Sequence, residues 1–194
     1  MEKSEPPGDY GPLFQRYLAV ILAFASKTRS MLFKSFALLM GGTMFLVVIP
    51  FLLYLSGEAL NAIININWPA EVEIPVAALS VCAGLFFLLW AVWAQLTIGR
   101  GTPAPIAPTS KLIVTGPYNL CRNPIQLGAC LYYLGIVTWV AGLMAGIVSF
   151  ALGMALGSFY HKVFEEKELL ARFGDDYLRY KETTPFIIPR LRIR

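Results

Sequence analysis

The stretch NPIQLGACLYYLGIVTWVAGLMAGIVSFALGMALGSFY, residues Asn123 to Tyr160, contains no Lys, Arg, Asp or Glu. It is about twice as long as the roughly 20 apolar residues that one transmembrane helix needs. Glycines at 142 and 146 allow the chain to reverse near the middle of the stretch. The stretch therefore predicts two membrane-spanning helices in a tight hairpin that turns near Ala141.

The composition of the whole chain is that of an integral membrane protein. Of its 194 residues, 57% are hydrophobic and 14% are charged, whereas globular proteins average roughly 45–50% apolar and 25% charged residues. A few spanning helices would use most of a chain of this length. A large separate soluble domain is therefore excluded.

Three further apolar segments precede the hairpin. Met31–Gly57 and Ile74–Gly99 are each long enough to span a membrane, and Pro50 is expected to kink the first of them. The segment Leu13–Ser26 is shorter and carries Arg16, so it either spans or lies in the interface, and we favour a span. The expected fold is thus an all-α polytopic membrane protein with about five transmembrane helices.

The basic residues are distributed unevenly along the chain. No Lys or Arg lies between Lys34 and Arg100, and the loop at 57–74 carries three glutamates. The positive-inside rule places that loop outside, and it places the segment 100–122 and the tail 162–194 on the cytoplasmic face. Two polar segments are therefore expected to meet on one side of the membrane.

The tail is expected to form a cytoplasmic subdomain. Its apolar residues recur at helical spacing, Gly174 is expected to end a helix, and Asp175 is expected to begin another. The three cysteines, Cys82, Cys121 and Cys130, lack a CxxC spacing, so we interpret them as small buried residues and expect no metal site.

The motifs of these polar segments resemble a known family. GPYNLCRNPIQLG, a helical hairpin, the pair Glu165–Glu166 and FGDDYLRYK resemble the C-terminal half of the isoprenylcysteine carboxyl methyltransferases. The wider group includes phospholipid N-methyltransferases and shares a Gly-x-Tyr, Arg-His-Pro-x-Tyr, Glu-Glu pattern. The resemblance implies an S-adenosylmethionine-dependent methyltransferase, with transmembrane helices in residues 1–99 and the catalytic region in residues 100–194.

The resemblance also implies site residues. Arg122 and Glu165 are the implied catalytic residues, and His161 is the implied substrate residue. The implied cofactor-binding residues are Ser110, Lys111, Leu112, Ile113, Val114, Tyr118, Asn123, Pro124, Ile125, Gln126 and Glu165.

Three positions depart from the family pattern. Asn123 stands in place of the family's histidine and Gln126 in place of its tyrosine. His161 stands where relatives that methylate prenylated proteins carry an arginine for the substrate carboxylate. Asn and Gln still offer hydrogen bonds to a carboxylate or an adenine edge, but a neutral histidine holds a carboxylate less firmly than a guanidinium does.

Each of these residues also has an interpretation in which it takes no part in catalysis or ligand binding. Arg122 suits a snorkelling anchor, and Tyr118 suits an aromatic belt at the interface. Glu165 and Glu166 suit a solvated helix face that pairs with nearby basic residues, and His161 suits an interfacial position at the end of a span.

The expected function is methyl transfer to the carboxylate of a lipophilic substrate, such as a C-terminal S-prenylcysteine. A carboxylate is already ionised at neutral pH and needs no general base, whereas an amine must first lose a proton. The alternatives are a phospholipid methyltransferase and a non-enzymatic membrane subunit or carrier, although a carrier should show polar residues within its spans. The expected partners are the lipid bilayer and the lipophilic substrate, without nucleic acid.

Overall fold

The computed structural model describes residues 11–25, 30–63, 66, 68–104 and 106–190. Every regular element within these residues is helical, which confirms the expected all-α membrane fold. The elements are α1 (Pro12–Ala25), α2 (Met31–Thr43), the π-helical turn η1 (Met44–Val48), α3 (Ile49–Asn61), α4 (Ala70–Thr97), α5 (Pro117–Leu120), α6 (Pro124–Ala141), α7 (Leu143–Tyr160), the π-helical turn η2 (His161–Glu165), α8 (Glu166–Phe173) and α9 (Asp175–Thr183).

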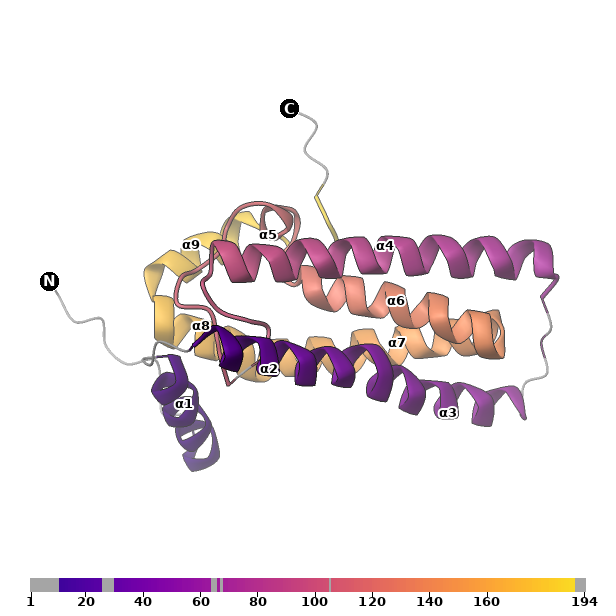
Figure 1. Ribbon diagram of the computed structural model, residues 1–194, viewed down its shortest axis with the longest axis horizontal. Helices are drawn as coiled ribbons and strands as arrows, with labels where there is room; N and C mark the ends of the chain where they lie inside the picture. The colour runs from indigo at the N-terminus through magenta and orange to yellow at the C-terminus, as the bar shows by residue number, and fades with distance from the viewer. Residues whose placement is uncertain (1–10, 26–29, 64–65, 67, 105, 191–194) are drawn as a thin grey trace, which may run out of the picture.

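The long helices lie side by side along one axis (Figure 1). Helix α6 packs against both α4 and α7, and α3 packs against α7 and α6. Helices α6 and α7 form the predicted hairpin, and its turn is at Gly142, which adopts φ = 87°. A positive φ of this kind costs glycine little, so the residue type suits the reversal.

The hairpin turn is fastened to the neighbouring helices. The carboxylate of Glu73 accepts a hydrogen bond of 2.8 Å from the backbone N–H of Leu143, at the start of α7. A carboxylate at this position satisfies a free N–H and faces the positive end of the helix dipole. The amide of Asn61 donates to the carbonyl of Ala141 at 2.8 Å, so α3 and α4 both hold the turn.

Glycines allow α4 and α6 to approach closely. A Cβ added to Gly84 would lie 2.4 Å from the backbone nitrogen of Tyr132, and one added to Gly128 would lie 2.8 Å from that of Leu88. Only a residue without a side chain fits on either face of this contact. Small residues at a helix contact of this kind let the two backbones approach closely inside a membrane.

The segment α2–η1–α3 is one continuous helix with a distortion before Pro50. Proline has no N–H for the carbonyl of Leu46, four residues earlier, and its ring crowds that carbonyl. The chain widens into the π-helical turn at this point, and the Tyr132 hydroxyl donates to the Leu46 carbonyl at 3.2 Å. A neighbouring helix thus satisfies the freed carbonyl, as helices inside a membrane require.

Four helices of the described part of the chain are long and apolar enough to span a membrane: Met31–Ala59, Ala70–Thr97, Pro124–Ala141 and Leu143–Phe173. Helix α1 has 14 residues, so at 1.5 Å per residue it is about 21 Å long, short of a hydrocarbon core of about 30 Å. It lies at the bundle end farthest from Gly142 and points away from the long axis (Figure 1). Helix α1 is therefore not among the helices of the described residues that are long enough to span, and the expected fifth span stays a prediction.

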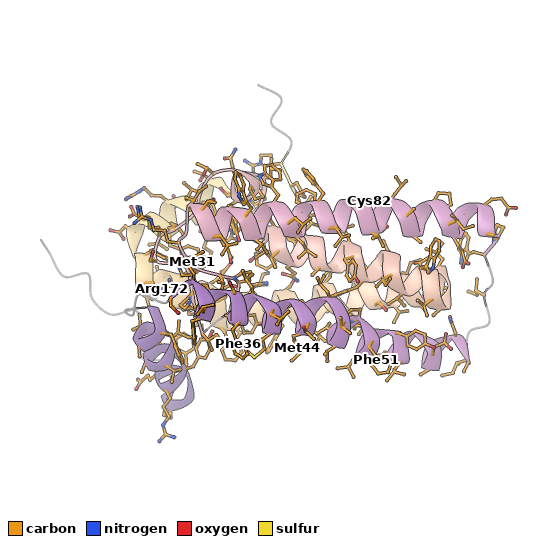
Figure 2. All side chains as sticks on the ribbon, viewed as in Figure 1. Met31, Phe36, Met44, Phe51, Cys82 and Arg172 are labelled. Atoms are coloured by element: carbon orange, nitrogen blue, oxygen red, sulfur yellow. The ribbon has the colours of Figure 1, made fainter. Side chains whose placement is uncertain are left out.

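The outer surfaces of the long helices are apolar. Phe36, Met44 and Phe51 project from α2, η1 and α3 (Figure 2) and are 58%, 49% and 58% exposed, as lipid-facing side chains are. Cys121 and Cys130 are buried as expected, but Cys82 is exposed. Its interpretation as a buried residue was wrong, because Cys82 faces outward from α4.

Candidate functional site

The two polar segments pack against each other at the α1 end of the bundle (Figure 1). A hydrophobic cluster joins the end of α4, the loop after it, and α9. Its buried members are Ala91, Ala94, Ile113, Tyr118, Tyr177 and Tyr180. Helix α8 ends and α9 begins at Gly174, which has φ = 52°, as the sequence predicted. The subdomain is therefore built from chain segments on both sides of the hairpin.

Tyr118 belongs to this core and not to an aromatic belt. It is 9% exposed, and its hydroxyl accepts a hydrogen bond of 2.7 Å from the Gln95 side chain. The Tyr180 hydroxyl donates to the Tyr118 carbonyl at 2.7 Å. Tyr118 thus links α4 to α9 through these two hydrogen bonds.

Arg122 forms an ion pair with the helix that follows the hairpin. Its Nη1 lies 2.7 Å from Oε1 of Glu166, and the two side chains are 11% and 15% exposed. Lys181 approaches the other oxygen of Glu166 at 2.6 Å. Arg122 is therefore paired with a part-buried carboxylate, unlike a snorkelling anchor with its charge in water.

The chain after α9 crosses over Arg122 and Asn123. The Arg122 N–H donates to the Pro185 carbonyl at 2.9 Å, and the Asn123 side chain donates to the Phe186 carbonyl at 2.9 Å. The centroid of the Phe186 ring lies 5.5 Å from Arg122 Cζ and 5.1 Å from Lys162 Nζ, so two cations contact this ring. The side-chain amide of Asn123 is therefore already hydrogen-bonded to the backbone of this protein.

Glu165 and His161 contact each other through Oε2 and Nδ1, four residues apart. They share a helix face, as side chains four residues apart on a helix do. Their side chains are 34% and 19% exposed. Glu165 is the more accessible member of the glutamate pair, whereas Glu166 is committed to Arg122 and Lys181.

Gln126 lies inside the hairpin and not on the surface of the subdomain. Its Nε2 donates to the Met154 carbonyl at 3.1 Å and to the Ser158 hydroxyl at 3.2 Å. The side chain fits against Gly157, where an added Cβ would lie 2.5 Å from Nε2. The preceding Pro124 is buried and Ile125 is half-buried, so this part of the predicted site is largely internal.

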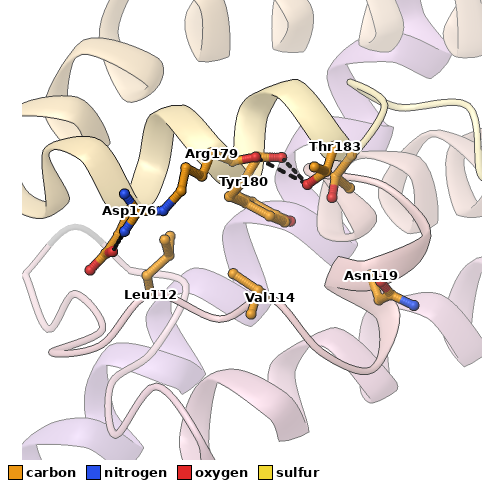
Figure 3. A pocket seen from close by; sticks show the side chains of 8 residues that line it. Leu112, Val114, Asn119, Asp176, Arg179, Tyr180 and Thr183 are labelled. Carbon is orange, nitrogen blue, oxygen red and sulfur yellow. Dashed lines mark hydrogen bonds and ion pairs between the residues drawn. The ribbon is translucent and has the colours of Figure 1, made fainter.

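A pocket of about 520 Å³ opens between the loop after α4 and helix α9 (Figure 3). Leu112 and Val114 line it from the loop. The other lining residues are Asn119 of α5, Asp176, Arg179, Tyr180 and Thr183 of α9, and Thr184 directly after α9. Arg179 and Asp176 pair with each other along one side of it. Of the implied cofactor residues, only Leu112 and Val114 line this pocket.

The implied site residues therefore fall into four groups. Leu112 and Val114 line the pocket; Ser110 and Lys111 are exposed beside it. Ile113 and Tyr118 are in the core. Arg122 and Asn123 lie under the segment that follows α9, and Gln126 lies inside the hairpin.

Sequence reasoning missed the pocket side of α9. Asp176, Arg179 and Thr183 recur at three- and four-residue spacing and so share one face. Tyr177 and Tyr180 of the same helix are 2% and 7% exposed. Helical periodicity separates Tyr177, which faces the core, from Arg179 and Thr183, which face the pocket, and Tyr180 contributes to both.

Three buried polar atoms near the site lack a hydrogen-bond partner among the described residues: Nε of Arg122, Oε1 of Gln95 and Oε1 of Gln126. Burial raises the pKa of Tyr177 to about 12; Glu166 adds to the rise and Arg122 opposes it. Burial also raises the pKa of Cys121 to about 11. Both groups stay protonated at neutral pH, so neither supplies a nucleophile or base.

No three His, Cys, Asp or Glu side chains of the described chain gather in a way that would hold a metal ion. The ionisable groups of the site are instead paired with one another. The arrangement is suited to binding and orienting charged or polar groups at the edge of an apolar bundle.

Comparison with known proteins adds three relatives. Methanethiol S-methyltransferase 2 of Bradyrhizobium diazoefficiens is 35% identical over 78 residues, 40% of this chain and 28% of the relative. Protein-S-isoprenylcysteine O-methyltransferase of Rattus norvegicus is 25% identical over 138 residues, 66% of this chain and 46% of the relative. The nickel-cobalt-cadmium resistance protein NccN of Alcaligenes xylosoxydans xylosoxydans is 27% identical over 128 residues, 66% of this chain and 54% of the relative.

This chain spans about half or less of the length of these relatives. No solved structure matches it. The family model described as phospholipid methyltransferase matches residues 72–176, which include α4, the polar loop, the hairpin and α8. The match covers more than half of the chain and agrees with the resemblance found in its motifs, so the chain belongs to the phospholipid methyltransferase family.

Proposed function

We propose that the protein transfers a methyl group from S-adenosylmethionine to the carboxylate of a lipophilic acceptor of the S-prenylcysteine type. The observation that carries this proposal is the position of Arg122. It joins the polar loop to α8 at the end of an uncharged hairpin, and its buried Nε–H has no partner among the described residues. A buried guanidinium N–H favours a carboxylate, because an unpaired buried donor is costly.

The residues present suit the chemical groups of the cofactor. S-adenosylmethionine has a carboxylate, an ammonium and an adenine amine; when bound, it supplies an electrophilic methyl group on a sulfonium. The unpaired Arg122 Nε is kept for the acceptor carboxylate, and the unpaired Oε1 atoms of Gln95 and Gln126 are acceptors for N–H groups of the cofactor. Glu165, partly exposed beside His161, is the carboxylate for the ammonium or ribose.

The chain's own residues then bind, orient and exclude water. The apolar hairpin would receive the lipid tail, and the polar loop would receive the water-soluble cofactor. A carboxylate acceptor needs no general base, so orientation is the main requirement, and orientation alone supplies roughly 7–11 kcal/mol of barrier reduction in favourable cases.

A second acceptor is favoured by a different observation. Glu166 neutralises Arg122, and Glu165 contacts His161, so carboxylates offset the basic groups at this end of the hairpin. That balance favours an amine head group, as in a phosphatidylethanolamine, over a carboxylate. The amine would have to lose a proton before it attacks.

Cofactor binding is tested by calorimetric titration of the detergent-purified protein with S-adenosylhomocysteine. Glu165→Ala should weaken binding, whereas the matched control Glu182→Ala, on the exposed side of α9, should not. Equal affinity of wild type and Glu165→Ala would remove Glu165 from the site, and no binding by the wild type would refute the proposal.

The acceptor is tested by transfer of labelled methyl from S-adenosylmethionine. N-acetyl-farnesylcysteine should yield a base-labile methyl ester slowly, and His161→Arg should increase the yield because it restores a charged partner for the carboxylate. Label on phosphatidylethanolamine, with no ester, would replace the first acceptor by the second.

A further inference from the structure

The side chain of Arg172 on α8 is buried, and the family resemblance assigns it no role. Its side chain is 7% exposed and pairs through Nη1 with Oε1 of Glu168 at 2.7 Å; the Glu168 side chain is 9% exposed. Its Nη2 donates to the backbone carbonyl of Thr109. Arg172 lies at the α1 end of the bundle (Figure 2). One guanidinium therefore joins α8 to the polar loop.

Thr109 is the residue at which the polar loop closes on itself. The next residue, Ser110, donates its N–H to the Gly99 carbonyl at 2.7 Å, so the ends of the loop meet there. The chain at Thr109 also passes directly over Gly101, where an added Cβ would lie 2.5 Å from Thr109 Cα. The position of Thr109 thus sets where the following residues, 110–114, begin.

Residues 110–114 are the segment that the family resemblance assigns to the cofactor. Two of them, Leu112 and Val114, line the pocket beside α9. This segment has no regular secondary structure, so its path depends on contacts at its ends. Arg172 supplies such a contact at the beginning of the segment, and the burial of Ile113 supplies one within it.

The chemistry of arginine suits this double contact. Its planar fork presents donors to a carboxylate and a carbonyl at the same time, whereas lysine has a single point charge. Glu168 is held in turn by the Tyr17 hydroxyl of α1, which donates to its Oε2 at 3.3 Å. Tyr17 therefore holds Glu168, Glu168 holds Arg172, and Arg172 in turn donates to the Thr109 carbonyl.

We propose that Arg172 is a positioning residue: oriented by Glu168, it holds the Thr109 carbonyl and so fixes the path of the cofactor segment 110–114. Arg172 acts through the loop backbone and does not touch the cofactor. The inference rests on the proposed function, because its consequence is measured as cofactor affinity.

The first measurement does not depend on cofactor binding. Hydrogen–deuterium exchange, read by mass spectrometry on peptides that cover 108–114, is compared between wild type, Arg172→Gln and Arg172→Lys. Arg172→Gln should speed exchange in these peptides and leave α6 peptides unchanged, with Arg172→Lys in between. The matched control Arg16→Gln removes a positive charge from the exposed face of α1 and should leave all these peptides as in wild type.

The second measurement is titration with S-adenosylhomocysteine. Arg172→Gln should weaken binding about ten-fold, which corresponds to about 1.4 kcal/mol, and the KM for the methyl acceptor should stay the same. Glu168→Gln keeps the side-chain shape and should give a smaller change in the same direction. A purely structural role would instead lower thermal stability and affect both substrates.

The outcomes separate the two proposals. If the wild type binds S-adenosylhomocysteine and Arg172→Gln binds it equally well, the positioning role is refuted and the proposed function stands. If exchange rises throughout the chain, or does not rise at 108–114, the positioning role is refuted too. If the wild type does not bind, the proposed function fails, and with it the claim that this segment serves a cofactor.

Discussion

The ion pair between Arg122 and Glu166 should be strongly coupled, and a double-mutant cycle measures that coupling. The variants are Arg122→Met, Glu166→Gln and the double variant. Removing one partner of a buried pair costs about 3–5 kcal/mol because it leaves an uncompensated charge. These side chains are 11% and 15% exposed, and Lys181 remains beside Glu166, so we expect about 2–3 kcal/mol for each single variant.

The coupling energy follows from the geometry of the contact. A hydrogen bond to a charged group contributes about 1.5–3 kcal/mol, and the 2.7 Å separation is that of a well-formed contact. We therefore expect about 2 kcal/mol of coupling in the Arg122–Glu166 cycle. The assay is equilibrium unfolding in mixed micelles with increasing dodecyl sulfate, followed by tryptophan fluorescence and circular dichroism.

The pair Arg179–Asp176 provides the matched control. Its side chains are 70% and 71% exposed, and exposed pairs contribute only about 0.2–1 kcal/mol. The same cycle on this pair should give less coupling than the buried pair. If the Arg122–Glu166 coupling were no larger than that of the control, the two polar segments would not be joined by a buried ion pair, and the site as described would be wrong.

Two further predictions concern packing and topology. Gly84→Ala should destabilise the bundle by about 1–3 kcal/mol, because its Cβ would meet backbone atoms of α6, whereas Gly41→Ala, which has no atom within 4 Å of its Cβ, should cause no loss; equal unfolding midpoints would contradict the α4–α6 contact. In a background without native cysteines, Asn65→Cys should react with an impermeant thiol reagent in intact cells and Arg194→Cys should not, because the positive-inside rule places the loop outside and the C-terminus in the cytoplasm. The reverse labelling pattern would invert the orientation.

Much of the fold was predictable because burial in a bilayer leaves a strong one-dimensional signal. A span needs an uninterrupted apolar run, so the uncharged stretch from 123 to 160 was sufficient to predict the hairpin. The reversal at Gly142 and the helix break at Gly174 were predictable for a local reason, since both need a positive φ that glycine adopts readily. The length of α1 was a weaker signal, because a short apolar helix with one arginine fits a span and an interface equally well.

The site was less predictable because its contacts join residues far apart in the chain. The motifs placed Arg122 and the glutamate pair on one membrane side, but only the packing of α8 against the loop decided that Glu166, and not Glu165, meets Arg122. Neighbouring glutamates on a helix point about 100° apart, so the choice between them depends on where the partner helix lies.

The sequence by itself therefore determined the membrane class, the hairpin, the helix ends and the family, each of which depends on local composition or on motif spacing. Tertiary structure alone decided that Tyr118 supports the core, that Gln126 is turned into the hairpin, and that Arg172 reaches the Thr109 carbonyl 63 residues away in the chain. The physical reason is that hydrogen bonds and ion pairs depend on distance and direction in space. In a bundle of closely packed helices, these distances and directions are set by the packing of all the helices together.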